Sequence, residues 1–390
     1  MKQILALLWI LLTMACSSPH GEGYRLYVQL KVPGDIVLQT ASGTEVKLIN
    51  TGNGTTYRAL ADTNGLASFD AEYGIYRLSA QLTWQEDAFS AYLLNAGLEN
   101  VLLTSGQGAG QDTIDIQLTN SPLSQIIIKE VYYAGCYDEK QYTKDGYLSI
   151  YNNSDHTVWL DSLCVGTIGP GNATKISPWL TYTPDKLAVI FMGWQFPGSG
   201  HDHPLEPGEE TVIAINAVNH CGSGYNHPNS VDLSSAGWAF YDTSLTMQDI
   251  TPGVKPLNLF LSTSTAKSYL FSLTGSGFIL YHIKGTTATE YAGNPDNLSS
   301  EPPAYTGMKY LMIPTDWIID CVDCVGDATK QGFKRVPSYL DAESTYLPSG
   351  TYSGRSLHRK VLENRDGRII YQDTNNSAND FEERVPTRKG

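Results

Sequence analysis

Four histidines gather in one stretch of the sequence. His201 and His203 are two residues apart, and His220 and His227 follow a short way along the chain. In an extended segment, side chains two residues apart project from the same face, as pairs of metal ligands do. His220, Cys221 or His227 would complete a tetrahedral site if the chain folds back. A solvated Gly/Pro loop explains the same residues without a cofactor, and His201, His203, His220 and His227 are the candidate ligands for zinc or another divalent metal.

Five cysteines follow the one at position 16, and an odd number leaves at least one thiol unpaired. They are Cys136, Cys164, Cys221, Cys321 and Cys324. The Cys-x-x-Cys spacing of the last two predicts a local disulfide between Cys321 and Cys324. Free buried thiols and a metal or redox role are the alternatives, because no second Cys-x-x-Cys or His-x₃₋₅-His pair complements this one.

The common catalytic signatures are missing from the sequence. It contains no Gly-x-Ser-x-Gly elbow, no His-Glu-x-x-His helix and no Gly-x₄-Gly-Lys-Ser/Thr loop. The carboxylate pairs Glu209-Glu210 and Glu382-Glu383 stand in turn-like or tail-like contexts, without an apolar pocket that would raise one pKa for acid catalysis. We expect a protein that is not an enzyme.

Aromatic residues are the other candidate contacts. Tyr and Trp at loop ends give a large contact area at low entropy cost, which favours protein interfaces and sugar stacking. Trp194, Tyr182, Tyr225 and Trp238 are the candidates for ligand or interface contacts, with packing in a sandwich core as the alternative. Trp194, in a loop that ends in Pro197-Gly198, is expected to be the most exposed.

Composition indicates strands and turns. The 390 residues include 24 Tyr, 36 Gly and 19 Pro, which favour an all-β fold. The 26 Lys and Arg against 40 Asp and Glu give a net charge of −14, without a concentrated basic surface for phosphates. Nucleic acid is therefore excluded as an expected partner.

The first residues are typical of a secretory signal. An apolar run from Ile4 to Leu12 is long enough for the core of a signal but too short to span a bilayer. Ala15-Cys16 at its end resembles a bacterial lipobox. We expect residues 1–15 to be a lipoprotein signal peptide, Cys16 to be lipidated, and 16–23 to form a linker from an outer-membrane lipid anchor.

Residues 24–119 predict a small β-sandwich. Short alternating runs are separated by turn signals: 24–32, 45–50, 55–61, 66–69, 73–81 and 113–118. The turn at Asp62 to Gly65, in which Asn64 and Gly65 tolerate positive φ, precedes a Gly74-Ile75-Tyr76 strand. Together these residues resemble the carboxypeptidase regulatory-like, transthyretin-like domain, an Ig-like sandwich without peptidase chemistry.

Residues 125–390 predict a second, larger sandwich. The run from Ile126 to Tyr133 is followed by Tyr147-Leu148-Ser149-Ile150-Tyr151-Asn152 and by Thr157 to Leu163. This order resembles the lamin-tail-type immunoglobulin-like domain, although Ser149 stands where that family usually places an acidic residue. The stretch 223–315 is expected to elaborate this sandwich by insertions.

With the tail motifs at Gly350 to Ser356 and at Gln372 to Phe381, the chain resembles an uncharacterised Bacteroidota lipoprotein family. The resemblance implies a binding or accessory protein that partners a TonB-dependent outer-membrane receptor in the uptake of iron, haem or a glycan. The alternatives are a metal-dependent envelope enzyme that uses the His201 to His227 region, and a structural or adhesive surface protein.

Overall fold

The computed structural model describes residues 24–34, 38–85, 91–104, 112–122, 125–190, 192–365 and 367–389. The predicted signal peptide, Cys16 and the 16–23 linker lie outside these residues. Strands make up most of the regular structure and each helix is short, which confirms the predicted all-β class. Among the described residues, no helix has both the length and the apolar character needed to cross a membrane.

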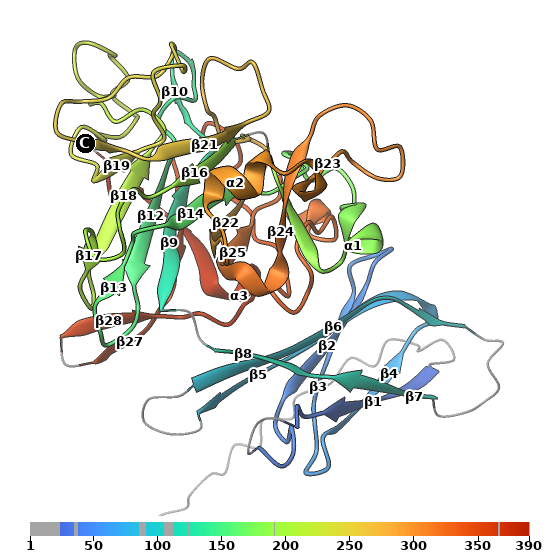
Figure 1. The fold of residues 1–390 in the computed structure, drawn as a ribbon. Helices are drawn as coiled ribbons and strands as arrows, with labels where there is room; N and C mark the ends of the chain where they lie inside the picture. Colours follow the sequence, from blue (N-terminus) through green and yellow to red (C-terminus); the bar gives the residue numbers. More distant parts are fainter. Residues whose placement is uncertain are drawn as a thin grey trace, which may run out of the picture.

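The first unit of the fold consists of two sheets built from β1 to β8 (Figure 1). One sheet has the order β4-β1-β7, and the other has the order β3-β2-β5-β6-β8. The strands are β1 (Tyr24–Lys31), β2 (Glu45–Asn50), β3 (Thr56–Leu60), β4 (Leu66–Ala71), β5 (Gly74–Gln85), β6 (Ala91–Leu103), β7 (Asp112–Gln117) and β8 (Thr119–Pro122).

Alternation of apolar residues places the core of this unit between its two sheets. Along β1, Leu26 and Val28 are fully buried, and they share one core cluster with Leu48 of β2 and Leu78 of β5. A strand with period-2 alternation buries one face and leaves the other free for solvent or another surface. The core of the first unit is therefore built by one face of each sheet.

The second unit is built from strands β9 to β29 and a few short helices. Its largest sheet has the order β20-β19-β18-β12-β9-β26-β29, and a five-stranded sheet has the order β21-β16-β14-β22-β25. Ile128, Leu148 and Ile213 of the first sheet share a core cluster with Val165 and Leu280 of the second. Two sheets packed face to face through apolar side chains form a sandwich.

The larger strands of this unit are β9 (Ile126–Tyr132), β12 (Tyr147–Asn152), β14 (Leu163–Thr167), β15 (Lys186–Val189), β16 (Met192–Gln195), β18 (Glu210–Ala214), β21 (Asn258–Ser262), β22 (Gly277–His282), β24 (Tyr310–Pro314), β25 (Ile318–Asp323), β26 (Ser356–Arg359), β27 (Val361–Arg365), β28 (Arg368–Tyr371) and β29 (Phe381–Arg384). The shorter strands are β10 (Cys136–Asp138), β11 (Lys140–Tyr142), β13 (Val158–Trp159), β17 (Pro204–Leu205), β19 (Trp238–Ala239), β20 (Lys255–Pro256) and β23 (Leu298–Ser299).

The helices are short and lie between strands. They are α1 (Trp179–Tyr182), α2 (Ala288–Gly293), α3 (Ser377–Asp380) and the 3₁₀ turns η1 (Pro295–Asn297), η2 (Thr315–Trp317) and η3 (Ala328–Lys330). Within the stretch 223–315, β19 and β20 extend the seven-stranded sheet, while β21 and β22 belong to the five-stranded sheet.

The two units are in direct contact. The outer face of β2, β5 and β6 in the first unit lies against residues 331–343 of the second, and Figure 1 shows these strands beneath the second unit. The contacts are Arg77 Nη1 to the Gln331 carbonyl at 3.3 Å, Asn95 Nδ2 to the Tyr339 carbonyl at 3.2 Å, and Lys47 Nζ to Glu343 Oε1 at 3.6 Å. Polar side chains on an otherwise solvent-facing sheet surface therefore join the units.

Gly97 of β6 lies close to Ser338 of the second unit. A Cβ added at Gly97 would lie 2.3 Å from the Ser338 Cβ, well inside van der Waals contact. The Ser338 hydroxyl also donates a 3.1 Å hydrogen bond to Glu99 Oε1. Glycine in a strand interior often marks close approach by another backbone or side chain, and Gly97 serves that purpose here.

We expect Gly97→Ala to weaken the docking of the two units by about 1–3 kcal/mol, the usual cost of overpacking. Small-angle X-ray scattering should show a larger radius of gyration for the variant. Adding Ser338→Gly removes the opposing Cβ and should restore the compact form, with Ser338→Gly alone as the control. An unchanged scattering profile for Gly97→Ala would contradict this account of the junction.

Candidate ligand-binding cleft

A cleft of about 840 Å³ opens where the end of the first unit meets the second. Its walls come from β8, the start of β9, β13, the end of β22, η2 and β25, with parts of two loops. This volume falls within the roughly 300–1,000 Å³ of small-molecule sites. Its lining residues are Thr119, Asn120, Gln125, Ile126, Thr157, Val158, Trp159, His282, Thr315, Asp316, Ile318, Ile319, Asp320, Cys321, Tyr339, Leu340 and Asn375.

Trp159 is the largest side chain in the cleft wall. It lies on the short strand β13, which pairs Trp159 with Pro204 of β17. Its ring packs against the His201 ring in a T-shaped arrangement, with ring centroids 4.7 Å apart and an interplanar angle of 75°. The indole is only partly buried, so this packing fixes the ring and leaves part of it open to the cleft. A fixed aromatic side chain is a low-entropy contact for a ligand.

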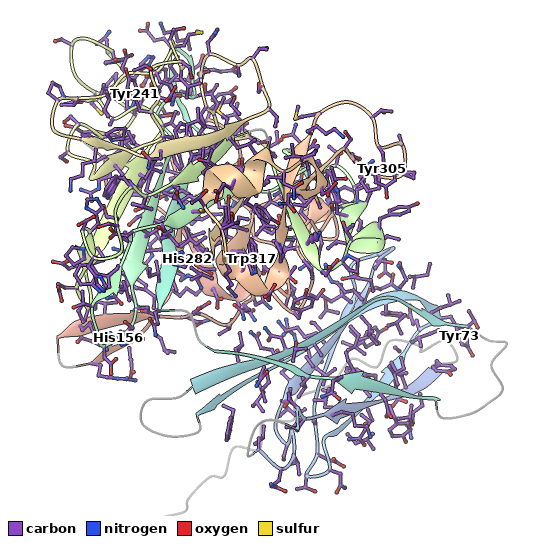
Figure 2. The ribbon with its side chains drawn as sticks, viewed as in Figure 1. Tyr73, His156, Tyr241, His282, Tyr305 and Trp317 are labelled. Carbon is purple, nitrogen blue, oxygen red and sulfur yellow. The ribbon has the colours of Figure 1, made fainter. Side chains whose placement is uncertain are left out.

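The polar side chains of the cleft are mainly amides and hydroxyls. Gln125 and Asn375 contribute amides, and Thr157 contributes a hydroxyl. His282 lines one side, with Nδ1 3.3 Å from the Ser162 carbonyl oxygen, and burial lowers its pKa from the ordinary value. Figure 2 labels His282 in the part of the second unit that faces the first. His282 is therefore neutral near pH 7.

Asp320 brings a buried carboxylate into the cleft wall. Its side chain accepts two hydrogen bonds of 2.8 Å from Nη2 of Arg359, and the backbone N–H of Ile128 donates a third at 2.6 Å. Burial raises the Asp320 pKa to about 7, although Arg359 acts in the opposite direction. The backbone N–H of Cys321 donates a further hydrogen bond at 2.8 Å, so the carboxyl group is held in position by three donor groups.

Arg359 carries more than one carboxylate. Its Nη1 also lies 2.9 Å from Asp373 Oδ1 and 3.4 Å from Asp380 Oδ2, and its Nε donates to the Ile128 carbonyl at 3.0 Å. Burial alone would lower the Arg359 pKa. The charges of Asp320, Asp373 and Asp380 outweigh this effect and raise the pKa above its ordinary value. One buried cation thus compensates three acidic side chains, all less than one-tenth exposed.

We expect Arg359→Met to lower the free energy of unfolding by about 3–5 kcal/mol at neutral pH, because it leaves buried carboxylates without their cation. Part of this loss should return as the pH is lowered and the carboxylates take up protons. Denaturant titration at several pH values measures both effects. The control, Arg365→Met on the exposed β27 strand, should change stability by less than about 0.5 kcal/mol. Equal effects of the two substitutions would contradict this role for Arg359.

A serine, a histidine and a glutamate meet on the other face of the seven-stranded sheet. His358 Nε2 lies 2.8 Å from Ser356 Oγ and 3.1 Å from Glu130 Oε1, and Ser356 Oγ also donates to Glu130 at 2.8 Å. In a nucleophilic triad, the serine and the acid contact different ring nitrogens. Here both contact Nε2 and all three residues are buried, so the group does not form such a relay.

Glu130 is instead the anchor of the C-terminal segment. The Thr387 backbone N–H donates to Glu130 Oε1 at 3.1 Å, and the Thr387 and Tyr147 hydroxyls also donate to this carboxylate. Burial would raise the Glu130 pKa, but hydrogen bonds from His358, Thr387 and Tyr147 outweigh it and lower the pKa to about 2. The ionised carboxylate is the form that these donors stabilise.

This shift predicts an acid-dependent loss of stability. The folded carboxylate stays ionised while the unfolded one takes up a proton below its ordinary pKa of 4.5, so its contribution is present above pH 4.5 and is lost toward pH 2. Between these values, the wild type should lose about 3 kcal/mol more than Glu130→Gln. Glu363→Gln on the exposed strand β27 is the control. Parallel pH profiles for wild type and Glu130→Gln in urea titrations would contradict the argument.

The structure does not bring the four predicted histidine ligands together. The His201 ring packs on Trp159, and the His203 ring packs on Trp238 at 4.9 Å. His220 and His227 contact a different partner, Tyr142. Over the residues that the structure describes, no group of three or more His, Cys, Asp or Glu side chains is arranged to hold a metal ion. His201 and His203 are only two residues apart, but each ring packs against a tryptophan.

His220 and His227 belong to a packed aromatic group. The Tyr142 hydroxyl lies 2.7 Å from His220 Nδ1, and His220 Nε2 lies 3.1 Å from the Asn216 carbonyl oxygen. The His227 ring stacks on Tyr142, with centroids 3.6 Å apart. Burial lowers the His220 pKa to about 4, so the ring is neutral, donating from Nε2 and accepting at Nδ1.

The four predicted aromatic contacts have different positions. Trp194 was expected to be the most exposed, and this is wrong, because its side chain is fully buried and packs between Phe240 and Tyr269 in the core. Trp238 is also buried. Tyr182 is 50% exposed at the end of α1, and Tyr225 donates a hydrogen bond to Asp249 at 2.7 Å. None of the four lines the cleft.

The predicted disulfide between Cys321 and Cys324 is absent from the structure, which contains both as free, buried thiols. Cys324 belongs to the core between the two large sheets, whereas Cys321 belongs to the cluster on the opposite face of the five-stranded sheet. Residues three apart in a strand point to opposite faces, so extended backbone keeps the two sulfur atoms apart. Burial raises both pKa values, which also makes the thiols unreactive.

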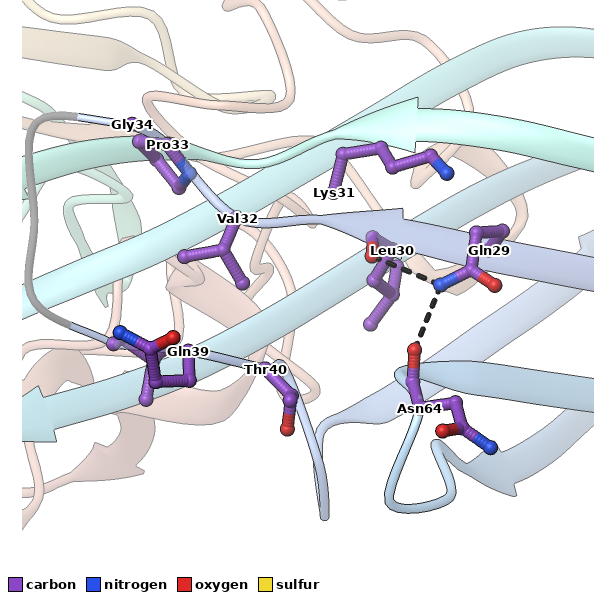
Figure 3. A pocket seen from close by; sticks show the side chains of 10 residues that line it. Gln29, Leu30, Lys31, Val32, Pro33, Gly34, Gln39, Thr40 and Asn64 are labelled. Atoms are coloured by element: carbon purple, nitrogen blue, oxygen red, sulfur yellow. Dashed lines mark hydrogen bonds between the residues drawn. The ribbon is translucent and has the colours of Figure 1, made fainter.

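A smaller hollow of about 420 Å³ lies at the end of β1 (Figure 3). Gln29 Nε2 donates to the carbonyls of Leu30 and Asn64 there, at 3.2 and 2.9 Å. Residues 35–37 are outside the described residues. The hollow carries no candidate site.

Comparison with known proteins finds similarity to a family of unknown function. Residues 206–387 match the family described as protein of unknown function (DUF4876). A crystal structure of a DUF4876 family protein from Bacteroides thetaiotaomicron is similar over 92% of this chain and 94% of that one, with a TM-score of 0.61 and 25% identity. No curated protein matches the sequence. These findings support a relationship to an uncharacterised Bacteroidota family.

Proposed function

We propose that the chain is a lipid-anchored binding protein of the outer membrane that holds its ligand in the cleft at the junction of its two units. The cleft is the observation that carries this proposal. It combines a fixed aromatic ring at Trp159, apolar side chains from Ile318 and Ile319, and a few polar groups. This combination is typical of small-molecule sites.

The anchor and the domain resemblances support the same proposal. Ala15-Cys16 resembles a lipobox, and acyl chains on Cys16 would hold the protein at a membrane without a spanning segment. The first unit is proposed to be a carboxypeptidase regulatory-like, transthyretin-like domain, and the second a lamin-tail-like sandwich. We further propose that the protein works as an accessory partner of a TonB-dependent receptor in nutrient uptake.

Replacement of Cys16 tests the anchor. Cys16→Ala should move the protein from the membrane pellet to the soluble fraction of the producing cell, because two or more acyl chains give stable anchoring and the variant has none. Cys221→Ser is the matched control, since Cys221 is a partly exposed cysteine within the second unit. Membrane retention of Cys16→Ala would contradict lipidation at this residue.

Recovery of companions under mild detergent tests the partnership. The tagged protein, solubilised from its native outer membrane, should bring a TonB-dependent barrel with it in stoichiometric amount, identified by mass spectrometry. Recovery of the protein without a barrel would contradict the accessory role, and it would leave the cleft to be tested by direct ligand binding.

A further inference from the structure

The charges of the cleft select among ligand classes. The side chains that line the cleft include two acidic residues, Asp316 and Asp320, and no lysine or arginine. Arg359 lies behind Asp320 and is fully engaged with carboxylates and backbone carbonyls. Lys284, which is not in the lining, lies 3.8 Å from the Asp316 carboxylate. An anionic ligand would therefore meet no lysine or arginine in the cleft wall, which disfavours haem propionates and phosphates.

The cleft is equally unsuited to a bare metal ion. His282 is directed to the Ser162 carbonyl, and Cys321 donates its thiol to the Leu340 carbonyl at 3.5 Å. Asp320 is occupied by its three donors. The described part of the chain holds no cluster of three metal-ligating side chains. Uncharged and cationic organic ligands remain, and the wall favours the uncharged class because its amide and hydroxyl side chains outnumber its one exposed carboxylate, Asp316.

The remaining features fit a ligand that is apolar on one face and rich in hydroxyls at its edges. Trp159 offers a ring held in place by His201, and a neutral ring of C–H groups would stack on it. The amides of Gln125 and Asn375 and the carboxylate of Asp316 can each accept hydrogen bonds from hydroxyls, and the amides can also donate. A sugar pyranose ring has this combination of an apolar face and polar edges.

We infer that the cleft binds an uncharged oligosaccharide, with Trp159 as the stacking platform and the Gln125 and Asn375 amides as hydroxyl contacts. This inference rests on the proposed binding function and specifies its ligand class. The Asp316 side chain of the cleft wall is 75% exposed to solvent, so a chain of sugar units can extend beyond the units that the cleft covers.

The test uses the full-length protein, solubilised in a detergent without a sugar head group, because a glucoside or maltoside would compete for the cleft. Isothermal titration against maltohexaose, cellohexaose, xylohexaose and mannohexaose tests the uncharged class. Haemin and a sulfated hexasaccharide test the anionic class. At least one neutral hexasaccharide should bind, and neither anion should compete with it.

Variants then assign the binding to the cleft. Trp159→Ala should weaken binding of the neutral sugar by roughly tenfold or more, as loss of an aromatic anchor does. Trp159→Phe should retain part of the affinity, and Gln125→Leu should weaken binding with the ring intact. Tyr137→Ala is the control, because Tyr137 is 57% exposed on β10 and does not line the cleft. A melting curve for each variant checks that it is folded.

The outcomes separate the ligand class from the binding function. Binding of haemin or the sulfated sugar that depends on Trp159 would overturn the oligosaccharide inference and support a ligand-binding cleft. Binding of a neutral sugar that is unaffected by Trp159→Ala and Gln125→Leu would overturn the assignment to this cleft. If none of these probes binds the folded protein, the oligosaccharide inference fails, whereas recovery of the barrel still decides the accessory role.

Discussion

A single buried guanidinium fixes the relative position of segments that are distant in the sequence. Arg359 on β26 contacts Asp320 on β25, the Ile128 carbonyl on β9, and Asp373 and Asp380 in the loop and helix before β29. A buried cation without partners is costly, so these groups have to assemble around it for the fold to be stable. The two large sheets are thereby held together at their edge by charge as well as by apolar packing.

The shape of the cleft depends on this arrangement around Arg359. Asp320 is held by Arg359, and its neighbours Ile318 and Ile319 on β25 form part of the cleft wall. The wall on the side of the first unit comes from β8, and Gly97 permits that unit to approach closely. The proposed ligand site is therefore built partly on strands held by buried contacts, which gives it more rigidity than loops alone, while loops contribute Gln125 and Asn375.

More of the fold than of the candidate site could be predicted from the sequence. Alternation and turn residues predicted β1 to β4 to within two residues at each end, whereas β5 continues four residues beyond its predicted end. The Asp62 to Gly65 turn forms with two hydrogen bonds to the Asp62 carboxylate. The longest strand, β6, has no counterpart among the predicted strands, because Asn95, Gly97 and Asn100 interrupt its alternation. Asn95 and Gly97 contact the second unit, and such a tertiary contact cannot be recognised from local alternation.

The site could not be predicted because its residues come from many elements. The Gly/Pro surroundings of Trp194 predict an exposed loop, but they follow a buried strand that contains Trp194. The histidines gave a strong local signal, yet their rings are used in packing with Trp159, Trp238 and Tyr142. Local composition does not show which side chains a sandwich turns inward.

The contact between Thr387 and Glu130 sets an order for folding during synthesis. The two residues are 257 positions apart, and Glu130 belongs to β9, the first strand of the second unit. While the ribosome extends the chain, the first unit can complete its own core. Glu130 lacks its C-terminal partner Thr387 until the end of synthesis. The second unit therefore matures only after nearly all of it has been translated, as a single late event.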